Sequence, residues 1–206
     1  MTTDRATDSI PNRHERLDQL HQRLNQIEER ITAPDFLACK GLGNEVPFHI
    51  FDYPAECELQ VREYIQVLIG ALESKHPGLR FAHVNLFELI VSILESRKLL
   101  QHAFEMQRTK GDEALKRNLR GVLGEAKVAQ AIVDATDPAQ QDLIIIHGIG
   151  TAWPLIRAHQ VISGLEPLMH QKPCIFFYPG TYTGLNLRLF DRLDSQDHYR
   201  AFRLVN

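Results

Sequence analysis

Residues 172–206 read KPCIFFYPGTYTGLNLRLFDRLDSQDHYRAFRLVN, and this C-terminal stretch decides the fold. An apolar run over residues 174–178 stops at Pro179-Gly180, and a second apolar run covers residues 201–205. Short apolar runs of this kind, rich in aromatic and β-branched residues and bounded by Pro and Gly, are typical of buried strands. The stretch therefore predicts two strands, with a loop over residues 181–184 after the first.

The segment between these two strands carries more tyrosine, arginine and glycine than a plain connector requires. Its simplest interpretation is structural, because glycines allow turn geometry and aromatic side chains cover the edge of a core. The alternative is a partner-binding surface, since Tyr and Arg supply a large share of the binding energy at protein interfaces. A third interpretation is a small-ligand or nucleic-acid site in which aromatic rings stack beside arginines. The candidate partner-binding residues are Tyr178, Tyr182, Arg188, Phe190, Tyr199 and Arg200.

Upstream of this stretch, apolar runs alternate with helical patterns. Residues 143–146, Leu-Ile-Ile-Ile, form an almost unbroken aliphatic strand, as expected in a parallel sheet buried on both faces. The other predicted strands cover residues 46–51 and 80–84, and the predicted helices cover residues 55–76, 86–106 after an Asn85 cap, 110–135 in two pieces, and 153–169 with Pro154 in its first turn. This alternation predicts a three-layer α/β domain with a mostly parallel sheet of about five strands.

The N-terminal part predicts a tail and one helix. Residues 1–12 are polar and are interpreted as a flexible tail. Residues 13–32 carry apolar side chains at intervals of three and four among charged ones, which is typical of an amphipathic helix. We expect this helix to pack on the single α/β domain of residues 13–206, and docking on a partner is the alternative. The apolar positions are Leu17, Leu20, Leu24, Ile27 and Ile31.

Composition limits the classes of function. The chain has 206 residues, 44% of them hydrophobic, with a net charge of −3 and a pI near 6.4. Proteins that bind nucleic acid by overall charge are basic, so direct nucleic-acid binding is not expected and any basic patch is local. The sequence has no 18-residue apolar stretch and no signal-peptide pattern, which predicts a soluble cytoplasmic protein without membrane contact. Three widely spaced cysteines favour reduced thiols over a metal or disulfide framework.

Ligands of such sheets bind at the carboxyl ends of the strands, which here carry Asp52, Asn85, His147 and Tyr178. The alternation of elements suits a core like that of P-loop NTPases or RecA. A phosphate-binding loop needs glycines and a Lys-Ser/Thr pair, but the segment after the first strand reads DYPAE over residues 52–56. We therefore predict a P-loop NTPase-like or RecA-like core that lacks the phosphate-binding loop.

Catalytic and metal-binding patterns are weak. The ten histidines are scattered, which is typical of packed or solvated side chains. Residues 73–75 and 125–127 match the Glu-x-Lys of restriction-type nucleases, but they lie in helical stretches, whereas the nuclease motif needs a strand. Nothing in the sequence matches the nucleophile elbow of hydrolases. The sequence therefore predicts no catalytic residue, no metal site and no cofactor.

The pattern F-Y-P-G-x-Y-x-G-x-x-L-x-L-F, followed by H-Y-R-A-F-R-L, resembles the C-terminal signature of the BrxB family, a component of BREX bacteriophage-exclusion systems. The runs at residues 143–150 and 153–159 also fit that family, so the resemblance covers most of the chain. It implies work beside larger enzymes, in a complex that methylates host DNA and blocks phage replication. The implied neighbours are a PglZ-like phosphatase-fold protein, a PglX-like methyltransferase and a large BrxC-like ATPase, and the PglZ-like protein is the first candidate for direct contact.

We therefore predict a non-catalytic adaptor or scaffold rather than an enzyme. The alternative is a DNA-binding or degenerate nuclease or nucleotide-binding component of the same system. An enzyme is expected to fail when a carboxylate such as Asp52 or Glu125 is lost, whereas an adaptor tolerates the loss. Replacing Tyr182 and Arg188 together by alanine is expected to weaken partner binding without unfolding the domain.

Overall fold

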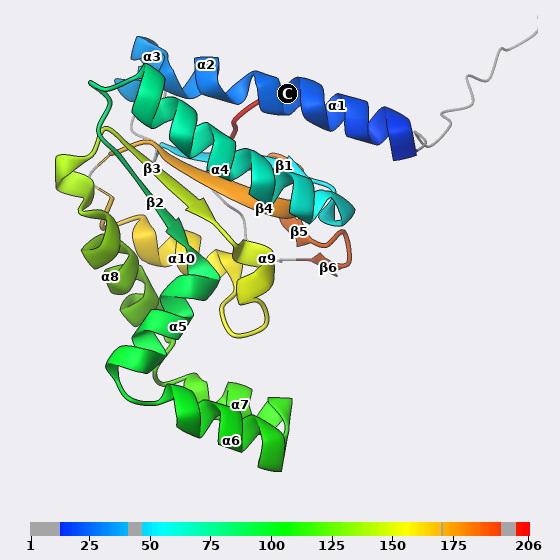
Figure 1. Ribbon diagram of the computed structural model, residues 1–206, viewed down its shortest axis with the longest axis vertical. Helices are drawn as coiled ribbons and strands as arrows, with labels where there is room; N and C mark the ends of the chain where they lie inside the picture. Colours follow the sequence, from blue (N-terminus) through cyan, green and yellow to red (C-terminus); the bar gives the residue numbers. More distant parts are fainter. Residues whose placement is uncertain (1–12, 41–46, 170, 195–200) are drawn as a thin grey trace, which may run out of the picture.

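The fold is built on one mainly parallel sheet with helices on both faces (Figure 1). The computed structural model describes residues 13–40, 47–169, 171–194 and 201–206. The predicted tail, residues 1–12, lies outside these ranges. The strands are β1 (Phe48–Tyr53), β2 (Phe81–Asn85), β3 (Leu143–His147), β4 (Cys174–Tyr182), β5 (Leu187–Leu189), β6 (Leu193–Asp194) and β7 (Phe202–Arg203).

The five strands β2, β3, β4, β1 and β7 follow one another in that order, and every pair among them is parallel. The short strands β5 and β6 extend β4 by antiparallel pairing. The predicted α/β class with a mostly parallel sheet of about five strands is thus confirmed. The finer prediction, a P-loop NTPase-like or RecA-like core, stays a prediction.

Helices cover both faces of this sheet. The helices of the described residues are α1 (Arg13–Asn25), α2 (Ile27–Thr32), α3 (Pro34–Leu37), α4 (Glu58–Lys75), α5 (Leu86–Ser96), α6 (Leu100–Lys110), α7 (Asp112–Leu119), α8 (Glu125–Thr136), α9 (Ile149–Ala152) and α10 (Ala158–Leu165), with short 3-10 turns at Ala55–Cys57 and Pro138–Gln140. Helices α1 to α4 lie on one face, and α5, α8, α9 and α10 lie on the other (Figure 1). The C-terminus ends beside α1 on the first face.

The aliphatic run of β3 shows why this arrangement suits the sequence. Leu143 and Ile145 pack into the core under α4, whereas Ile144 and Ile146 pack into the core under α5 and α8. All four side chains have 0% exposure because successive residues of a strand point to opposite faces and both faces are covered. The expectation of a strand buried on both sides is therefore confirmed.

Two strands run further than predicted. Strand β1 ends at Tyr53 rather than at residue 51, and β4 continues through Pro179 and Gly180 to Tyr182. The predicted loop over residues 181–184 is therefore wrong in its first half. Pro179 does not end β4, because it stays paired with Tyr53 of β1 and its carbonyl accepts a hydrogen bond from the Phe190 N–H at 2.9 Å.

Several helices are shorter than the sequence predicted. The expected helix over residues 86–106 breaks after α5, where Lys98 has a φ of 58°. The expected helix over residues 153–169 is wrong at its start, because α9 ends at Ala152 and the next helix begins only at Ala158. The N-terminal helix also divides, between α1 and α2. In contrast, the two-piece prediction for residues 110–135 is confirmed by α7 and α8.

The predicted Asn85 cap of α5 is confirmed, but Glu88 contacts the side chain of Asn85 rather than its backbone N–H as in a capping box. The Asn85 side-chain oxygen accepts hydrogen bonds from the backbone N–H groups of Phe87, at 3.0 Å, and of Glu88, at 3.4 Å. The Asn85 side-chain amide also donates to the Glu88 carboxylate at 3.1 Å. These bonds satisfy two of the N–H groups that have no partner within the helix, so they fix where α5 begins at the carboxyl end of β2.

Helices α6 and α7 form a hairpin that projects from the end of α5, away from the sheet (Figure 1). Gly111 joins them with a φ of 76°, a conformation that a side chain would strain. The hairpin has little core of its own, since Ala103 is the buried residue of α6 and Leu119 that of α7. Across the described ranges, no helix has the length and apolar character of a membrane span.

Candidate functional site

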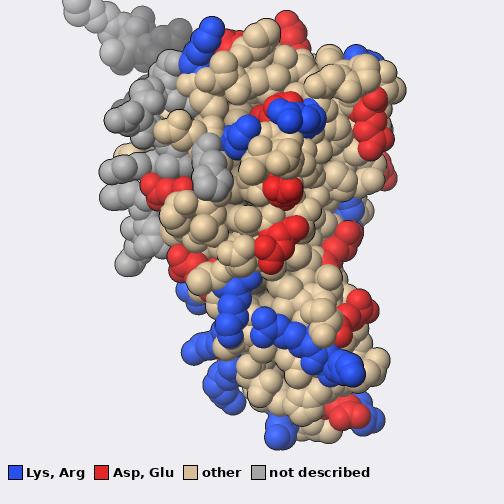
Figure 2. Space-filling model, turned by 90° about the vertical axis from the view of Figure 1, so that its left-hand side faces the viewer, with Lys and Arg blue, Asp and Glu red and all other residues tan. Residues whose placement is uncertain are grey.

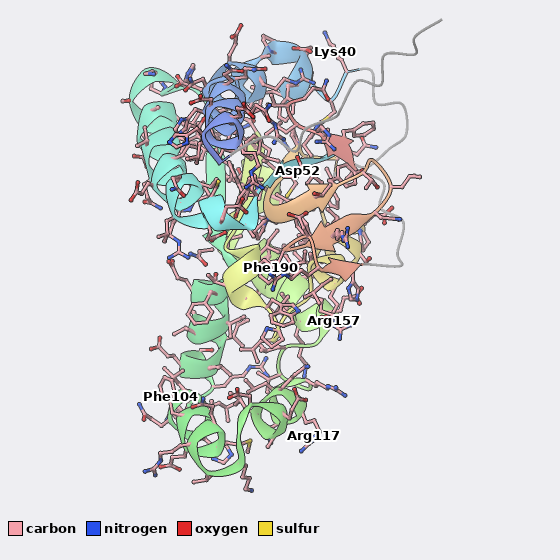
Figure 3. All side chains as sticks on the ribbon, turned by 90° about the vertical axis from the view of Figure 1, so that its right-hand side faces the viewer. Lys40, Asp52, Phe104, Arg117, Arg157 and Phe190 are labelled. Carbon is pink, nitrogen blue, oxygen red and sulfur yellow. The ribbon has the colours of Figure 1, made fainter. Side chains whose placement is uncertain are left out.

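The sequence predicts that ligands bind at the carboxyl edge of the sheet, and Asp52 is a buried carboxylate at this edge (Figure 3). Asp52 is 5% exposed. It pairs with Arg23 of α1 at 2.7 Å and with Arg203 of β7 at 3.1 Å. The backbone N–H of Tyr182 donates to its second oxygen at 2.9 Å. We call these four residues the Asp52 network.

Further hydrogen bonds of the Asp52 network go to backbone carbonyls. Arg23 donates to the carbonyl of Asp52 at 2.8 Å and lies over the Phe51 ring at 4.8 Å. Arg203 donates to the carbonyl of Tyr182. The Tyr182 hydroxyl donates to the carbonyl of Ala201 at 2.6 Å. The network therefore joins α1, β1, β4 and β7, and its carboxylate is used as a structural tie.

A second polar cluster lies on the α4 side of the same edge. The His147 ring, 5% exposed, has its Nε2 atom 3.4 Å from Nδ1 of His83 on the neighbouring strand β2. Burial, followed by the nearby His83 and Arg62 charges, lowers the pKa of His147 to about 4, so the ring is neutral at pH 7. On β1, the Tyr53 hydroxyl donates to the Glu58 carboxylate at 2.7 Å.

Metal binding requires a larger group of ligands than this cluster supplies. Among the described residues, no three His, Cys, Asp or Glu side chains gather closely enough to hold a metal ion. The two Glu-x-Lys matches lie in α4 and α8, as expected from the sequence. Their lysines are engaged elsewhere: Lys75 pairs with Glu28 at 3.1 Å, and Lys127 donates to the carbonyl of Gly121.

His49 is a buried histidine of β1 with an apolar environment. It is 3% exposed, and its ring lies 4.5 Å from the Phe36 ring and 5.8 Å from the Phe202 ring. Neither of its ring nitrogens has a hydrogen-bond partner among the described residues. Burial, with a smaller effect of the Arg30 charge, lowers the pKa of His49 to about 4.

His49 predicts a loss of stability in mild acid. Because its pKa is 6.5 when unfolded and about 4 when folded, protons bind the unfolded chain first, and stability falls as the pH drops from 6.5 towards 4. Between pH 7 and pH 5, we expect His49 alone to lower the free energy of unfolding by about 2 kcal/mol. Urea denaturation at pH 7 and pH 5 should show that His49→Phe loses about 2 kcal/mol less of its free energy of unfolding between the two pH values than the unchanged protein does. The same change at the exposed His102 should leave the loss intact; equal behaviour of both variants would contradict the assignment.

An aromatic pair marks the other side of the carboxyl edge. The Trp153 ring stands edge-on to the Phe190 ring, with centroids 6.0 Å apart and planes at 89°. Trp153 is 40% exposed, and Phe190, which is labelled in Figure 3, is half-buried. Gly150 lets α9 approach closely, since a Cβ there would stand 2.8 Å from Pro179 and 3.1 Å from Phe190. The pair is therefore held on a tightly packed support.

The structure separates the predicted partner-binding residues. Tyr178 is 2% exposed and Tyr182 is 0% exposed, so neither ring lies on the surface where the sequence-based hypothesis placed it. Arg188 is exposed and Phe190 is half-buried. Tyr199 and Arg200 lie outside the described residues. A role of the six candidate residues in partner binding stays a prediction.

Trp153 is the surface residue that the sequence reasoning missed. The sequence pattern predicts it in the first turn of a helix, whereas it follows α9 in an irregular segment. The sequence feature that could have indicated its exposure is a single tryptophan that follows a Gly-x-Gly turn. The double replacement of Tyr182 and Arg188 is also unsuitable as a binding test, because it removes a buried ring and its hydrogen bonds.

These features define a class: an α/β protein whose strand-end carboxylate is neutralised by its own arginines and which carries an aromatic pair at the same edge of the sheet. Residues 82–204 match the sequence model of the family described as BREX protein BrxB. The chain belongs to the BrxB family, as its C-terminal pattern predicted.

Two curated relatives are similar over most of their length. The chain is 45% identical over 176 residues to the BREX protein BrxB of Escherichia coli O9:H4 (strain HS), which covers 85% of this chain and 86% of that protein. It is 34% identical over 197 residues to the BREX protein BrxB of Bacillus cereus (strain H3081.97), covering 94% and 97%. No solved structure matches the chain.

Proposed function

We propose that this chain is a non-catalytic adaptor of a BREX complex and that the Trp153–Phe190 pair is its docking point for a protein partner. Membership of the BrxB family makes it a component of a BREX system, which is consistent with phage defence. The observation that carries the adaptor role is the aromatic pair, with its exposed Trp153, at the edge of the sheet where an enzyme of this class would hold its reacting groups.

The aromatic pair has the properties of an interface anchor. Tryptophan is enriched among the residues that dominate binding energy, and an already ordered ring loses little entropy when a partner covers it. Two further apolar side chains are exposed on the β4–β6 extension, Leu185 at 61% and Leu193 at 40%. Arg188 and Arg192 are exposed on the same extension and supply polar groups of the kind found at interface rims.

The partner that we propose first is a PglZ-like protein, with a PglX-like methyltransferase and a BrxC-like ATPase as further members of the complex. In this role the chain supports host DNA methylation and phage exclusion by holding its partners together, without a reaction of its own. The engagement of Asp52 with two arginines supports this proposal, because an ion-paired, buried carboxylate has no free oxygen to offer to water or a metal ion.

Trp153→Ala is expected to weaken the complex with the PglZ-like protein by about tenfold or more, because it removes the exposed anchor. The measurement is co-purification of the tagged chain at moderate salt, followed by titration and mass determination in solution. Circular dichroism should show an unchanged fold, since the Trp153 side chain is only partly covered.

Leu59→Ala is the matched control for this experiment. Leu59 is an apolar side chain of α4 with 66% exposure, and it lies on the opposite face of the sheet from α9. We expect it to bind the partner as the unchanged protein does. A Trp153→Ala protein that binds normally would overturn the proposed docking point, and a chain that never forms the complex would overturn the choice of partner.

A further inference from the structure

The projecting hairpin is the most basic part of the chain. Residues 97–120, which contain the α5–α6 turn, α6 and α7, hold seven Lys or Arg against three Asp or Glu, a net charge of +4. Because the whole chain has a net charge of −3, the remaining residues sum to −7. We call residues 97–120 the basic hairpin. Its cations are Arg97, Lys98, Arg108, Lys110, Lys116, Arg117 and Arg120.

The charge of the basic hairpin is concentrated in space as well as in sequence. Figure 2 shows Lys and Arg gathered over the lower, projecting part of the molecule, whereas acidic residues are spread over the body above it. All of these cations except Lys116 belong to exposed residues. A separation of charge on this scale gives one end of the molecule a positive potential and the other a negative one.

Most cations of the basic hairpin have no carboxylate partner among the residues that the structure describes. Among the described residues, its one ion pair joins Lys116 to Glu113 at 3.7 Å within α7. Elsewhere the chain does pair its cations, for example Arg80 with Asp142 at 2.6 Å and Arg23 with Asp52 at 2.7 Å. The hairpin therefore presents cations that an external anion can bind.

We propose that the basic hairpin binds the phosphate backbone of double-stranded DNA. Duplex DNA carries regularly spaced negative charges, and Lys and Arg contacts to its phosphates supply most sequence-independent affinity. The net charge of the chain as a whole argued against such binding, but that charge is an average over a basic end and an acidic body. The acidic body is repelled by the phosphates, so the DNA approaches the hairpin end.

Two features favour duplex DNA over other anionic partners. The cores of protein interfaces are apolar, whereas α6 and α7 expose a single large apolar ring, Phe104 at 58%. Single-stranded nucleic acid is bound on several stacked aromatic rings, and the hairpin has only this one. A pair of short helices with exposed cations and one exposed aromatic ring therefore favours contact with the phosphates of a duplex.

The test measures binding of a fluorescently labelled duplex by anisotropy, with Arg117→Glu compared with Lys40→Glu. Both residues are exposed, both substitutions change the net charge equally, and the two positions lie at opposite ends of the molecule (Figure 3). We expect Arg117→Glu to weaken binding about fivefold or more at about 50 mM salt and to lower the slope of log K against log salt concentration by about one. Lys40→Glu should change affinity less than about twofold.

Three outcomes would overturn the proposal. In the first, the unchanged protein does not bind the duplex at low salt. In the second, Arg117→Glu and Lys40→Glu weaken DNA binding equally. In the third, Arg117→Glu binds DNA normally but no longer co-purifies with the protein partner. The last result would make the hairpin a protein-binding surface. The proposal is independent of the adaptor role, because Trp153→Ala should still bind the duplex and Arg117→Glu should still bind the partner protein.

Discussion

Replacing Asp52 by alanine is expected to lower the free energy of unfolding by about 3–5 kcal/mol, because it removes one side of a buried ion pair and leaves the other side charged. Arg23 loses its carboxylate partner, and its Nε atom already lacks a hydrogen-bond partner among the described residues. Arg203 also loses its counter-ion, and the buried N–H of Tyr182 loses its acceptor. The contacts among α1, β1, β4 and β7 all weaken at once.

Urea denaturation at neutral pH measures this effect, and Asp35→Ala is its control. Asp35 forms an exposed ion pair with Arg30 at 3.4 Å, so its loss should cost less than about 1 kcal/mol. A loss at Asp52 as small as that at Asp35 would contradict the structural role of the Asp52 network. The expected result also changes how an Asp52 variant is interpreted, because loss of function would follow from unfolding in an adaptor as well as in an enzyme.

Gly180→Ala is expected to destabilise the protein by about 3 kcal/mol through strain and the loss of hydrogen bonds between β4 and β5. Gly180 has a φ of 145°, and a Cβ there would stand 2.1 Å from the backbone oxygen of Arg188 and 2.9 Å from the nitrogen of Phe190. Backbone atoms of a paired strand cannot move aside as a flexible side chain can. The β4–β5 pairing must therefore open.

Two measurements check this prediction. Thermal unfolding should show a lower midpoint for Gly180→Ala, whereas Gly70→Ala should be neutral or stabilising, because Gly70 lies in α4 with nothing within 4 Å of its added Cβ. The chain has one tryptophan, so the fluorescence of Trp153 reports on its contact with Phe190. A shift of that emission to longer wavelength is expected in Gly180→Ala, and an unchanged spectrum with unchanged stability would refute the strain argument.

The sequence predicted those parts of the fold that depend on local pattern. The aliphatic run of β3 could be recognised because both of its faces are apolar, and Asn85 because a helix cap acts on the next three residues. The family could also be recognised from its C-terminal pattern. Each of these signals lies within a short stretch of chain. Residues that are close in such a stretch are also close in space, so the sequence pattern alone reveals their contacts.

Where the elements end was less predictable, because tertiary contacts decide it. Strand β4 continues past Pro179 since its carbonyl is bound by Phe190, which lies beyond the following turn. The α5–α6 break depends on Lys98 taking a left-handed conformation, for which lysine has no special preference. A local pattern contains neither piece of information.

The composition and order of the elements determined the α/β class, the parallel sheet and the charge of residues 97–120. Only the tertiary structure decided which residues form the candidate sites. Asp52 meets Arg23 from 29 positions away and Arg203 from 151 positions away. The same folding buries Tyr182 and leaves Trp153 exposed. The physical reason is that ion pairing and burial depend on distance in space, which the chain sets only when its strands and helices have packed.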